Sequence, residues 1–357
     1  MKTNSTRATT WQRFRRNPSA MFGAIILFLF ILIAILGYSI TPDKTRNADQ
    51  QSVEIQAMPP GYSQMFLAIQ NNNRPQPWYW PVTGKLLSKR LIPINSYSVR
   101  NDSLYFQQYV DADTSFAASI PYKANGNITI LQKKYLLGTD GFGRDMLSRL
   151  MIGARVSLSV GLIAVFISLF IGVFLGAISG YYRGRIDAVV MWLINVTWSI
   201  PTLLLVLALT LALGKGFWQI FIAVGLTMWV NVARLVRGQV LAMSELEFIQ
   251  ASKVLGVSNM RIIFRHILPN ILGPILVIAT ANFAAAIIIE AGLSFLGIGV
   301  QPPVPSWGLM IKENYNFIIT QHPMLALLPG IAIMLLVLSV NLVGNGLRDA
   351  MDVRSGK

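Results

Sequence analysis

The chain has 357 residues, of which 54% are hydrophobic and 13% are charged, and it carries a formal net charge of +15. An ordinary soluble domain has about 25% charged residues, so this composition excludes a soluble globular protein and indicates a membrane protein. The sequence contains no cysteine, which excludes disulfide bonds, thiol catalysis and thiolate metal sites.

Six uncharged apolar runs predict helices that cross the membrane. Each is long enough for the roughly 17–25 residues that span the hydrocarbon core, and helices satisfy their backbone hydrogen bonds internally. The runs cover 19–42, 156–182, 188–214, 216–233, 267–289 and 323–347. The first run lacks the cleavage site of a signal peptide, so we expect an uncleaved helix. The predicted fold class is an all-α polytopic membrane protein with six transmembrane helices.

The distribution of basic residues predicts the topology. With six spans both termini lie on one side, and fifteen of the seventeen Lys and Arg residues in short loops and tails fall on that side. Only Lys215 and Lys312 fall on the other. Because short cytoplasmic loops carry the excess of Lys and Arg, we expect both termini to be cytoplasmic. Topology thus explains the positive charge, and nucleic acid is not an expected partner.

Composition divides the chain into four parts. Residues 1–18 form a cytoplasmic tail, 19–40 the first transmembrane helix, 41–137 an extracytoplasmic insert, and 138–357 a core with five further transmembrane helices. The core includes a polar cytoplasmic loop at 239–270, which lies between two spans.

The insert is rich in Asn, Gln, Pro, Ser and Tyr and is too long for a simple connection, so we expect a small subdomain. Segments 96–110 and 127–137 have the β-branched and aromatic content of short strands. The aromatic residues Trp78, Tyr79 and Trp80 have three interpretations: an aromatic belt at the bilayer interface, part of a core, or a contact with a binding protein.

The polar loop has the pattern of two short helices. Ser244 and Glu247 have the spacing of a capping box, which predicts a helix start. Gly256 predicts the end of that helix, because glycine readily adopts the left-handed conformation of a C-terminal turn. Ser258 predicts the cap of a second helix and Pro269 its end. An apolar face is supplied by Leu246, Phe248, Ile249, Val254 and Leu255.

This loop resembles the EAA loop of ABC importer permeases, the surface that engages an ATPase. The family pattern is Glu-Ala-Ala, three residues, Gly, and Leu-Pro further on. The corresponding residues are Gln250-Ala251-Ser252, Gly256 and Leu268-Pro269. Glutamine at position 250 removes the charge of the family's acid, which favours coupling by shape and packing. The resemblance implies ATPase coupling by Glu247, Gln250, Ala251, Gly256, Leu268 and Pro269.

The segment before the second span combines a glycine-rich turn with a helix start. Gly138, Gly141 and Gly143 favour a tight turn, and Asp145 is placed where its charge suits a helix dipole. The segment is similar to the Gly-Thr-Asp-x-x-Gly-Arg-Asp signature of the dipeptide/oligopeptide/nickel permease family, in its C-type subunit. The matching residues are Gly138, Thr139, Asp140, Gly143, Arg144 and Asp145.

Two further stretches, 290–308 and 341–352, match the same family, and the resemblance covers 1–40 and 135–357. It implies a MetI-like permease fold in the bacterial cytoplasmic (inner) membrane. The implied function is ATP-driven import of di- or oligopeptides, with nickel or another small solute as the alternative. The implied partners are a second homologous permease subunit, two ATPase subunits that bind ATP and Mg, and an extracytoplasmic substrate-binding protein. We expect no cofactor on this chain itself.

Three residues inside or directly after the predicted spans are candidates for the pathway or gate. Glu290 is either an acid at bilayer depth or a cap for a helix break at Gly292 near the outer interface. Asn282 either lines a polar pathway or bonds between helices, and we favour the second interpretation. Pro201 is expected to kink the third span. The two histidines fall on opposite membrane faces, so no metal site is predicted.

The sequence contains no phosphate-binding loop and no evident Ser–His–acid set, so we expect no enzymatic activity in this chain. ATP hydrolysis is expected on another subunit. A secondary transporter driven by an ion gradient is the alternative from a different class. It would show inverted repeats and several ionisable residues in the membrane, whereas Glu290 is the one interior acid that we nominate. A membrane scaffold with a functional outer domain is a third hypothesis.

Overall fold

The computed structural model describes residues 10–70, 75–100, 103–111, 113–121, 128–214, 216–319 and 322–351. Lys215 and the chain ends 1–9 and 352–357, which entered the charge count and the last family motif, lie outside the described residues. The chain folds into two compact units. The first, which we call the helical unit, comprises Met1–Phe30, Ser157–Gln301 and Ile333–Lys357. The second, which we call the insert unit, comprises Ile31–Val156 and Pro302–Ala332.

Most of the chain is helical. Three long helices have residues in both units: α2 (Pro18–Ile40), α4 (Met146–Tyr182) and α12 (Met324–Met351). The other helices of the helical unit are α1 (Thr10–Arg16), α5 (Gly184–Trp198), α6 (Thr202–Leu213), α7 (Phe217–Ser244), α8 (Glu247–Val254), α9 (Asn259–Arg261), the π turn η3 (Ile262–Ile267), the 3-10 turn η4 (Leu268–Ile271) and α10 (Leu272–Phe295).

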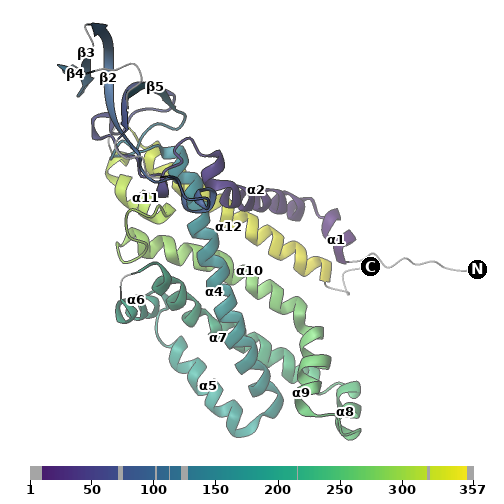
Figure 1. Ribbon diagram of the computed structural model, residues 1–357. Helices are drawn as coiled ribbons and strands as arrows, with labels where there is room; N and C mark the ends of the chain where they lie inside the picture. Colours follow the sequence, from purple (N-terminus) through teal and green to yellow (C-terminus); the bar gives the residue numbers. More distant parts are fainter. Residues whose placement is uncertain are drawn as a thin grey trace, which may run out of the picture. The chain divides into compact units, whose positions relative to one another are not determined.

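The six predicted spans correspond to five long helical stretches and one bent pair. In the described chain, α2, α4, α7, the helical stretch Asn259–Phe295 and α12 are long and apolar enough to cross a membrane. The pair α5 and α6 qualifies as a sixth span and is bent by 93° (Figure 1). Pro201, with ψ 127°, stands immediately before α6 at this break. A proline lacks the N–H that would continue the helix and disfavours helical geometry in the residue before it, so the predicted kink at Pro201 is confirmed.

Glycines spaced four residues apart let α4 and α7 pack closely within the helical unit. A Cβ added to Gly172 would lie 2.5 Å from the Cβ of Val232, and one added to Gly176 would lie 2.5 Å from the carbonyl oxygen of Ala233. Gly180 likewise faces the backbone of α7. Helices in lipid associate through such close packing, because lipid is as apolar as the helix surface.

The insert unit contains a five-stranded antiparallel sheet in the order β4-β3-β2-β1-β5. Its strands are β1 (Tyr62–Gln70), β2 (Lys89–Arg100), β3 (Ser103–Tyr109), β4 (Ser115–Pro121) and β5 (Ile128–Tyr135). The short helices of this unit are η1 (Arg46–Ala48), η2 (Val53–Ile55), α3 (Trp80–Thr83), α11 (Trp307–Asn314) and η5 (Tyr315–Ile318).

The predicted strands at 96–110 and 127–137 correspond to the β2–β3 hairpin and to β5, whereas β1 and β4 were not predicted. In β1, Leu67 lies opposite Ile92 of β2 and Ile130 of β5. Leu67 and its neighbour Phe66 belong to apolar clusters on opposite faces of the sheet. Because both faces of β1 are covered, its sequence lacks the simple apolar–polar alternation of a half-exposed strand.

We expect Gly176→Leu to lower the thermal unfolding midpoint of the purified protein. The added side chain would meet the backbone of α7, and overpacking of this kind costs about 1–3 kcal/mol. The matched control is Gly238→Leu on α7, because a Cβ there meets no atom of the described chain within 4 Å. An equal loss in both variants would contradict close packing of α4 against α7.

Candidate functional site

The signature segment 138–145 joins β5 to α4 through a turn that needs glycine at two positions. Gly138 and Gly143 have φ of +76° and +70°, a conformation that other residues rarely adopt. A Cβ at these positions would also collide with the carbonyl oxygens of Met58 and Ser52, respectively. The predicted tight turn is therefore confirmed, and both backbone conformation and crowding require it to contain glycine.

Two other signature residues attach the turn to its surroundings. The hydroxyl of Thr139 donates to the carbonyl oxygen of Ile55 at 2.5 Å and accepts from the N–H of Met58 at 2.9 Å. Asp145 lies at the start of α4, as predicted, where its Oδ2 accepts from the N–H of Ser148 at 2.9 Å. This contact is that of an N-capping residue, which satisfies a backbone donor that the first helical turn leaves free.

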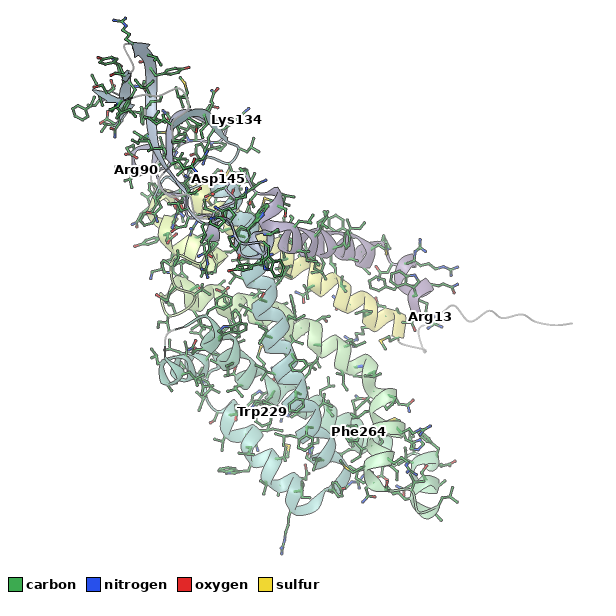
Figure 2. The ribbon with its side chains drawn as sticks, viewed as in Figure 1. Arg13, Arg90, Lys134, Asp145, Trp229 and Phe264 are labelled. Atoms are coloured by element: carbon green, nitrogen blue, oxygen red, sulfur yellow. The ribbon has the colours of Figure 1, made fainter. Side chains whose placement is uncertain are left out.

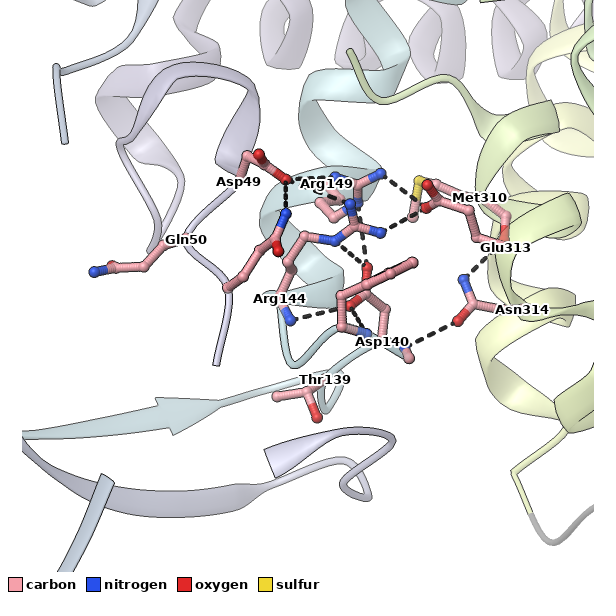
Figure 3. A network of polar contacts seen from close by, with 12 residues as sticks. Asp49, Gln50, Thr139, Asp140, Arg144, Arg149, Met310, Glu313 and Asn314 are labelled. Carbon is pink, nitrogen blue, oxygen red and sulfur yellow. Dashed lines mark hydrogen bonds and ion pairs between the residues drawn. The ribbon is translucent and has the colours of Figure 1, made fainter. Parts of the chain in front are cut away.

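A buried group of charges lies against the signature turn, and we call it the charge cluster (Figure 3). It consists of Asp49, Asp140, Arg144, Arg149 and Glu313. The guanidinium of Arg144 contacts Asp140 at 2.7 Å, Glu313 at 2.6 Å and Asp49 at 3.4 Å. Burial acts to lower the pKa of Arg144, but the carboxylates of Asp140 and Glu313 outweigh it, so this pKa is raised.

Arg149 binds the same three carboxylates from the first turns of α4. It lies 3.2 Å from Glu313, 3.4 Å from Asp140 and 3.8 Å from Asp49, and its side chain is 1% exposed. Two guanidinium groups thus face three carboxylates in a site nearly closed to water. Buried charges persist only when they are paired. Because arginine keeps its proton in proteins, the cluster is suited to holding segments together and not to proton transfer.

The charge cluster connects the ends of two family motifs. Glu313 belongs to α11, which begins within the predicted motif at 290–308. Asn314 of the same helix accepts a hydrogen bond from the N–H of Gly141 at 3.2 Å. The indole of Trp307 donates to the carbonyl oxygen of Leu150 on α4 at 2.9 Å. The sequence predicted the signature residues but not Asp49, Arg149 or Glu313 as their partners. The available signal was an arginine at the start of a long apolar helix, which must find a buried carboxylate.

The carboxyl group of Asp145 belongs to a second polar group of residues in the insert unit, together with Ser148 and Asp43. Burial raises the pKa of Asp145 and the hydrogen bonds from Ser148 lower it, whereas the nearby carboxylate of Asp43 raises it again. The net effect is a raised pKa. Ser148 also accepts a hydrogen bond from the N–H of Asp43 at 2.9 Å, which places the segment after α2 beside the start of α4.

The predicted capping box in the loop between α7 and α10 is wrong. Helix α7 continues through Ser244, and α8 begins after Leu246, whose backbone is extended and whose side chain offers no cap. The side chain of Gln250 acts instead on the end of α7, because its Nε2 donates to the carbonyl oxygen of Ser244 at 2.7 Å. Gln250 therefore satisfies a carbonyl group that the end of α7 leaves free.

The prediction that Gly256 ends the first helix is confirmed. Gly256 has φ +75°. Its N–H donates to the carbonyl oxygen of Lys253 at 3.0 Å, and that of Val257 donates to Ser252 at 3.1 Å. These two bonds form a Schellman motif. A Cβ at Gly256 would meet nothing within 4 Å in the described chain, so backbone conformation and not crowding calls for glycine.

The second half of the loop departs from its prediction. Ser258 stands at the cap position of α9 as predicted, although its side chain makes no cap hydrogen bond. The predicted helix end at Pro269 is wrong, because the chain continues through η3 and η4 into α10. Pro269 lies in the first residues of η4, where the N–H that proline lacks is not needed for the hydrogen bonds of the turn, and the π turn η3 precedes it.

The predicted apolar face of the loop divides into a buried and an exposed part. Ile249 is fully buried in a cluster with Ile262, Ile263, Ile267 and residues of α7. In contrast, Val254 and Leu255 are 88% and 82% exposed, and Leu246 and Phe248 are nearly half exposed. Of the predicted coupling residues, Leu268 packs against the buried cluster. The exposed ones are Glu247, Gln250, Ala251, Gly256 and Pro269.

An ion pair joins the helices next to this loop. Arg237 on α7 makes two contacts, of 2.5 and 2.6 Å, with the carboxylate of Asp187 on α5. The hydroxyl of Ser179 on α4 donates to the same carboxylate at 2.9 Å. Arg183 and Glu245 form a second ion pair at the end of α7. Three transmembrane helices therefore meet at the base of the loop.

The predicted pathway residues have different surroundings. Asn282 on α10 is buried and donates to the carbonyl oxygen of Met228 at 3.3 Å, so it bonds between helices, which is the interpretation that we favoured. Glu290 is buried within α10 and accepts from the hydroxyl of Ser294 at 2.6 Å. Because α10 continues to Phe295, the alternative in which Glu290 caps a helix break at Gly292 is wrong.

The break at Pro201 lies beside a cavity of about 200 Å³. This cavity is lined by residues of α5, α6, α7 and α10, among them Trp198 and Asn231, and the indole of Trp198 donates to Asn231 at 3.3 Å. Within the described residues, no group of three or more His, Asp or Glu side chains is placed to hold a metal ion.

The fold and these motif-bearing sites define a multi-pass membrane protein of the permease class. The family model "Binding-protein-dependent transport system inner membrane component" matches residues 172–357. The model "N-terminal TM domain of oligopeptide transport permease C" matches residues 5–60. The chain belongs to the family of inner membrane components of binding-protein-dependent transport systems.

Three relatives illustrate the range within this family. The dipeptide transport system permease protein DppC of Alkalihalophilus pseudofirmus is 44% identical over 61% of this chain and 72% of its own length. The oligopeptide transport system permease protein OppC of Bacillus subtilis is 42% identical over 63% of this chain and 73% of its own length. The glutathione transport system permease protein GsiD of Escherichia coli is 42% identical over 61% and 72%.

Among solved structures, a chain of the inward-facing MetNI methionine ABC transporter is similar to this chain. The TM-score is 0.47 at 18% identity, and the match covers 56% of this chain and 94% of the other.

We expect the stability of the protein to depend most strongly on the arginines of the charge cluster. Arg149→Leu leaves three carboxylates with the single guanidinium of Arg144, and this loss of a buried positive charge is expected to destabilise the protein by about 3–5 kcal/mol. Asp49→Asn is the milder comparison, because the Asp49 carboxylate is 25% exposed and makes only the long contacts of 3.4 and 3.8 Å. Thermal unfolding of both variants checks this order, and a larger effect of Asp49→Asn would contradict it.

Two substitutions of Asp145 should separate the stability that its helix cap contributes from the effect of its carboxyl charge. Asp145→Ala loses the cap and is expected to cost about 1 kcal/mol, whereas Asp145→Asn keeps it. A carboxyl with a raised folded-state pKa stabilises most at low pH, and this contribution is lost as pH rises from its ordinary value of 3.8 toward the raised value. The unfolding midpoint of Asp145→Asn, relative to wild type, should therefore increase with pH from about 4 upward. A difference that does not change with pH would contradict the assignment.

Proposed function

We propose that this chain is the permease subunit of an ATP-driven ABC importer for di- or oligopeptides. The observation that carries the proposal is the surface of the polar loop at 239–270, which contains α8 and α9 and which we call the α8–α9 loop. Ile249 fixes its inner side to a buried cluster, while Val254 and Leu255 lie on its outer side almost fully exposed. Apolar side chains exposed on a polar loop are typical of a surface that a partner protein covers.

The partner that fits this surface is an ATPase subunit that binds ATP and Mg. The sequence of this chain has no phosphate-binding loop, so a separate subunit has to supply the energy. When two ATPases close on ATP, the helix pair that they hold moves with them. The ion pair between Arg237 and Asp187 is suited to pass this movement from the loop to α5 and the bent α5–α6 pair.

The loop couples by shape and packing under this proposal. The amide of Gln250 is engaged with the carbonyl oxygen of Ser244, so its role is to hold α8 against α7. Gly256 supports the same surface in two ways. Its left-handed backbone turns the chain sharply after α8, and the open space beside it allows a partner to approach closely.

The membrane path is proposed to run beside the break at Pro201. The lining of the nearby cavity includes Trp198, Asn231 and Thr227, which combine an aromatic surface with groups that hydrogen-bond to a peptide. The path is completed by a second, homologous permease subunit, and a substrate-binding protein delivers the cargo from outside. Both termini and the α8–α9 loop lie on the cytoplasmic side, as the excess of Lys and Arg there supports.

Di- or oligopeptides are the cargo that the relatives support best, since two of the three carry dipeptide or oligopeptide transport in their names and the third glutathione transport. Nickel or another small solute is the alternative within the same class. An ion-driven secondary transporter is the alternative from another class. Uptake by reconstituted protein that needs ATP and persists without an ion gradient would exclude it.

Charged substitutions on the loop surface should release the ATPase. In the variant Val254→Asp/Leu255→Asp we expect the chain to insert normally, while the ATPase no longer co-purifies and ATP-dependent peptide uptake is lost. The substituted side chains point outward, so folding should be little affected. The control is Val99→Asp on β2, where the replaced valine is also exposed. Retention of the ATPase by the loop variant would place the contact elsewhere.

A further inference from the structure

A cavity of about 170 Å³ opens in the insert unit directly after the first transmembrane helix. Helix α2 ends at Ile40, and the next residues, Pro42 to Thr45, form one wall of the cavity. The segment 85–89 and β5 form the other walls. Because α2 is long and apolar enough to span the hydrocarbon core, we expect a cavity that begins two residues beyond it to lie near the lipid headgroups.

The lining of this cavity is strongly basic. It contains four lysines and a single carboxylate, that of Asp43. Both oxygens of Asp43 already accept backbone hydrogen bonds, from Thr45 at 2.9 Å and from Gln50 at 3.2 Å. The lysines are Lys44, Lys85, Lys89 and Lys133. The cavity therefore has an excess of positive charge that is suited to an oxyanion.

One of these lysines, Lys133, bonds another residue that lines the cavity. Its ammonium donates to the side-chain oxygen of Gln50 at 2.6 Å. Burial lowers the pKa of Lys133, even though the carboxylates of Asp43 and Asp145 act to raise it. An anion in the cavity would favour the charged ammonium and so offset part of the cost of its burial.

Exposed apolar side chains border the lysines. Leu86 and Leu87 line the cavity, and Leu87 is 61% exposed. The neighbouring Trp78 is 89% exposed and Val82 is 63% exposed. Aromatic and basic side chains that occur together beside a membrane helix are typical of the lipid interface, where the apolar part lies in the acyl region and the charge reaches the headgroups.

A direct contact holds this apolar border at the end of the membrane helix. The guanidinium of Arg155 on α4 donates to the carbonyl oxygen of Ala34 on α2 at 2.6 Å. It also donates to the carbonyl oxygen of Val82 on α3 at 2.5 Å. Helix α3 and its exposed side chains are thereby joined to the last turns of α2.

We propose that this cavity binds the phosphate group of a membrane phospholipid, in the leaflet on the side of the insert, with Trp78, Val82 and Leu87 in contact with its apolar part. A phosphate has the charge that four lysines can hold, and a free anion in water would give no reason for the exposed apolar border. The bound lipid would fix the insert to the membrane surface. This proposal is independent of the transported cargo and of which side of the membrane the insert occupies.

Native mass spectrometry of the full-length protein, purified with its co-purifying subunits, tests the proposal. The probes are phosphatidylglycerol, phosphatidylcholine and inorganic phosphate. We expect wild type to retain phosphatidylglycerol, and Lys44→Gln/Lys89→Gln to lower its affinity about tenfold or more, since each lysine near a lipid surface contributes substantially. These two lysines are chosen because Lys85 lies over the Trp80 ring at 4.5 Å and Lys133 bonds Gln50, so their loss would disturb packing.

The matched control is Lys134→Gln/Arg100→Gln, which removes the same charge from exposed sheet positions outside the cavity (Lys134 is labelled in Figure 2). Equal lipid loss in both variants would overturn the proposal, because it would show that the lipid is held only by the overall positive charge of the protein and not by this cavity. So would a wild type that retains no phospholipid. Binding of inorganic phosphate that displaces the lipid at millimolar concentration would assign the cavity to a free anion instead.

Tryptophan fluorescence supplies a second readout that needs no lysine variant. In vesicles that contain brominated phosphatidylcholine, we expect wild type to be quenched more strongly than Trp78→Phe, because Trp78 lies in the lipid. Equal quenching of both proteins would place Trp78 in water or against a partner such as a binding protein, and it would overturn the proposed lipid contact.

Discussion

In the hydrocarbon core of a membrane, each backbone N–H and C=O group must find its partner within the protein. This constraint accounts for the long helices, and it limits how they are interrupted. The chain changes direction at Pro201 between two helices, and it passes Pro269 through π and 3-10 turns that lead into α10. Because lipid provides no hydrophobic force between helices, close packing holds them together, and the glycine row of α4 from Gly172 to Gly180 allows it.

The same demand for partners applies to charges where the chain leaves the membrane. Arg144 and Arg149 are buried beside the first turn of α4, and they are compatible with the fold because three carboxylates from separate segments surround them. The signature motif therefore has a structural explanation: Gly138 and Gly143 allow the tight turn that brings Asp140 to the arginines. Sequence reasoning found the turn and the capping aspartate, but not Glu313, which comes from a helix far along the chain.

The α8–α9 loop shows how one apolar pattern serves two purposes. Ile249 holds the loop to the membrane helices, whereas Val254 and Leu255 remain available outside. Helical spacing identified all three as apolar without distinguishing them. The loop also corrects the capping-box prediction. Helix α7 continues through Ser244, and Gln250, six residues further on, bonds its final carbonyl group, so a different local contact replaces the predicted capping box.

The sequence by itself determined the features that depend on local composition and spacing: the membrane class, the six apolar runs, the break at Pro201, the turn at Gly138 and Gly143, and the helix end at Gly256. These features follow from the length of the hydrophobic runs and from backbone conformations that only certain residues adopt. The tertiary structure alone decided which residues meet, including the partners of Arg149, the lysines that share one cavity and the exposed tip of the loop. Such contacts join segments far apart in the chain, and no local pattern specifies which of the many possible pairs will form.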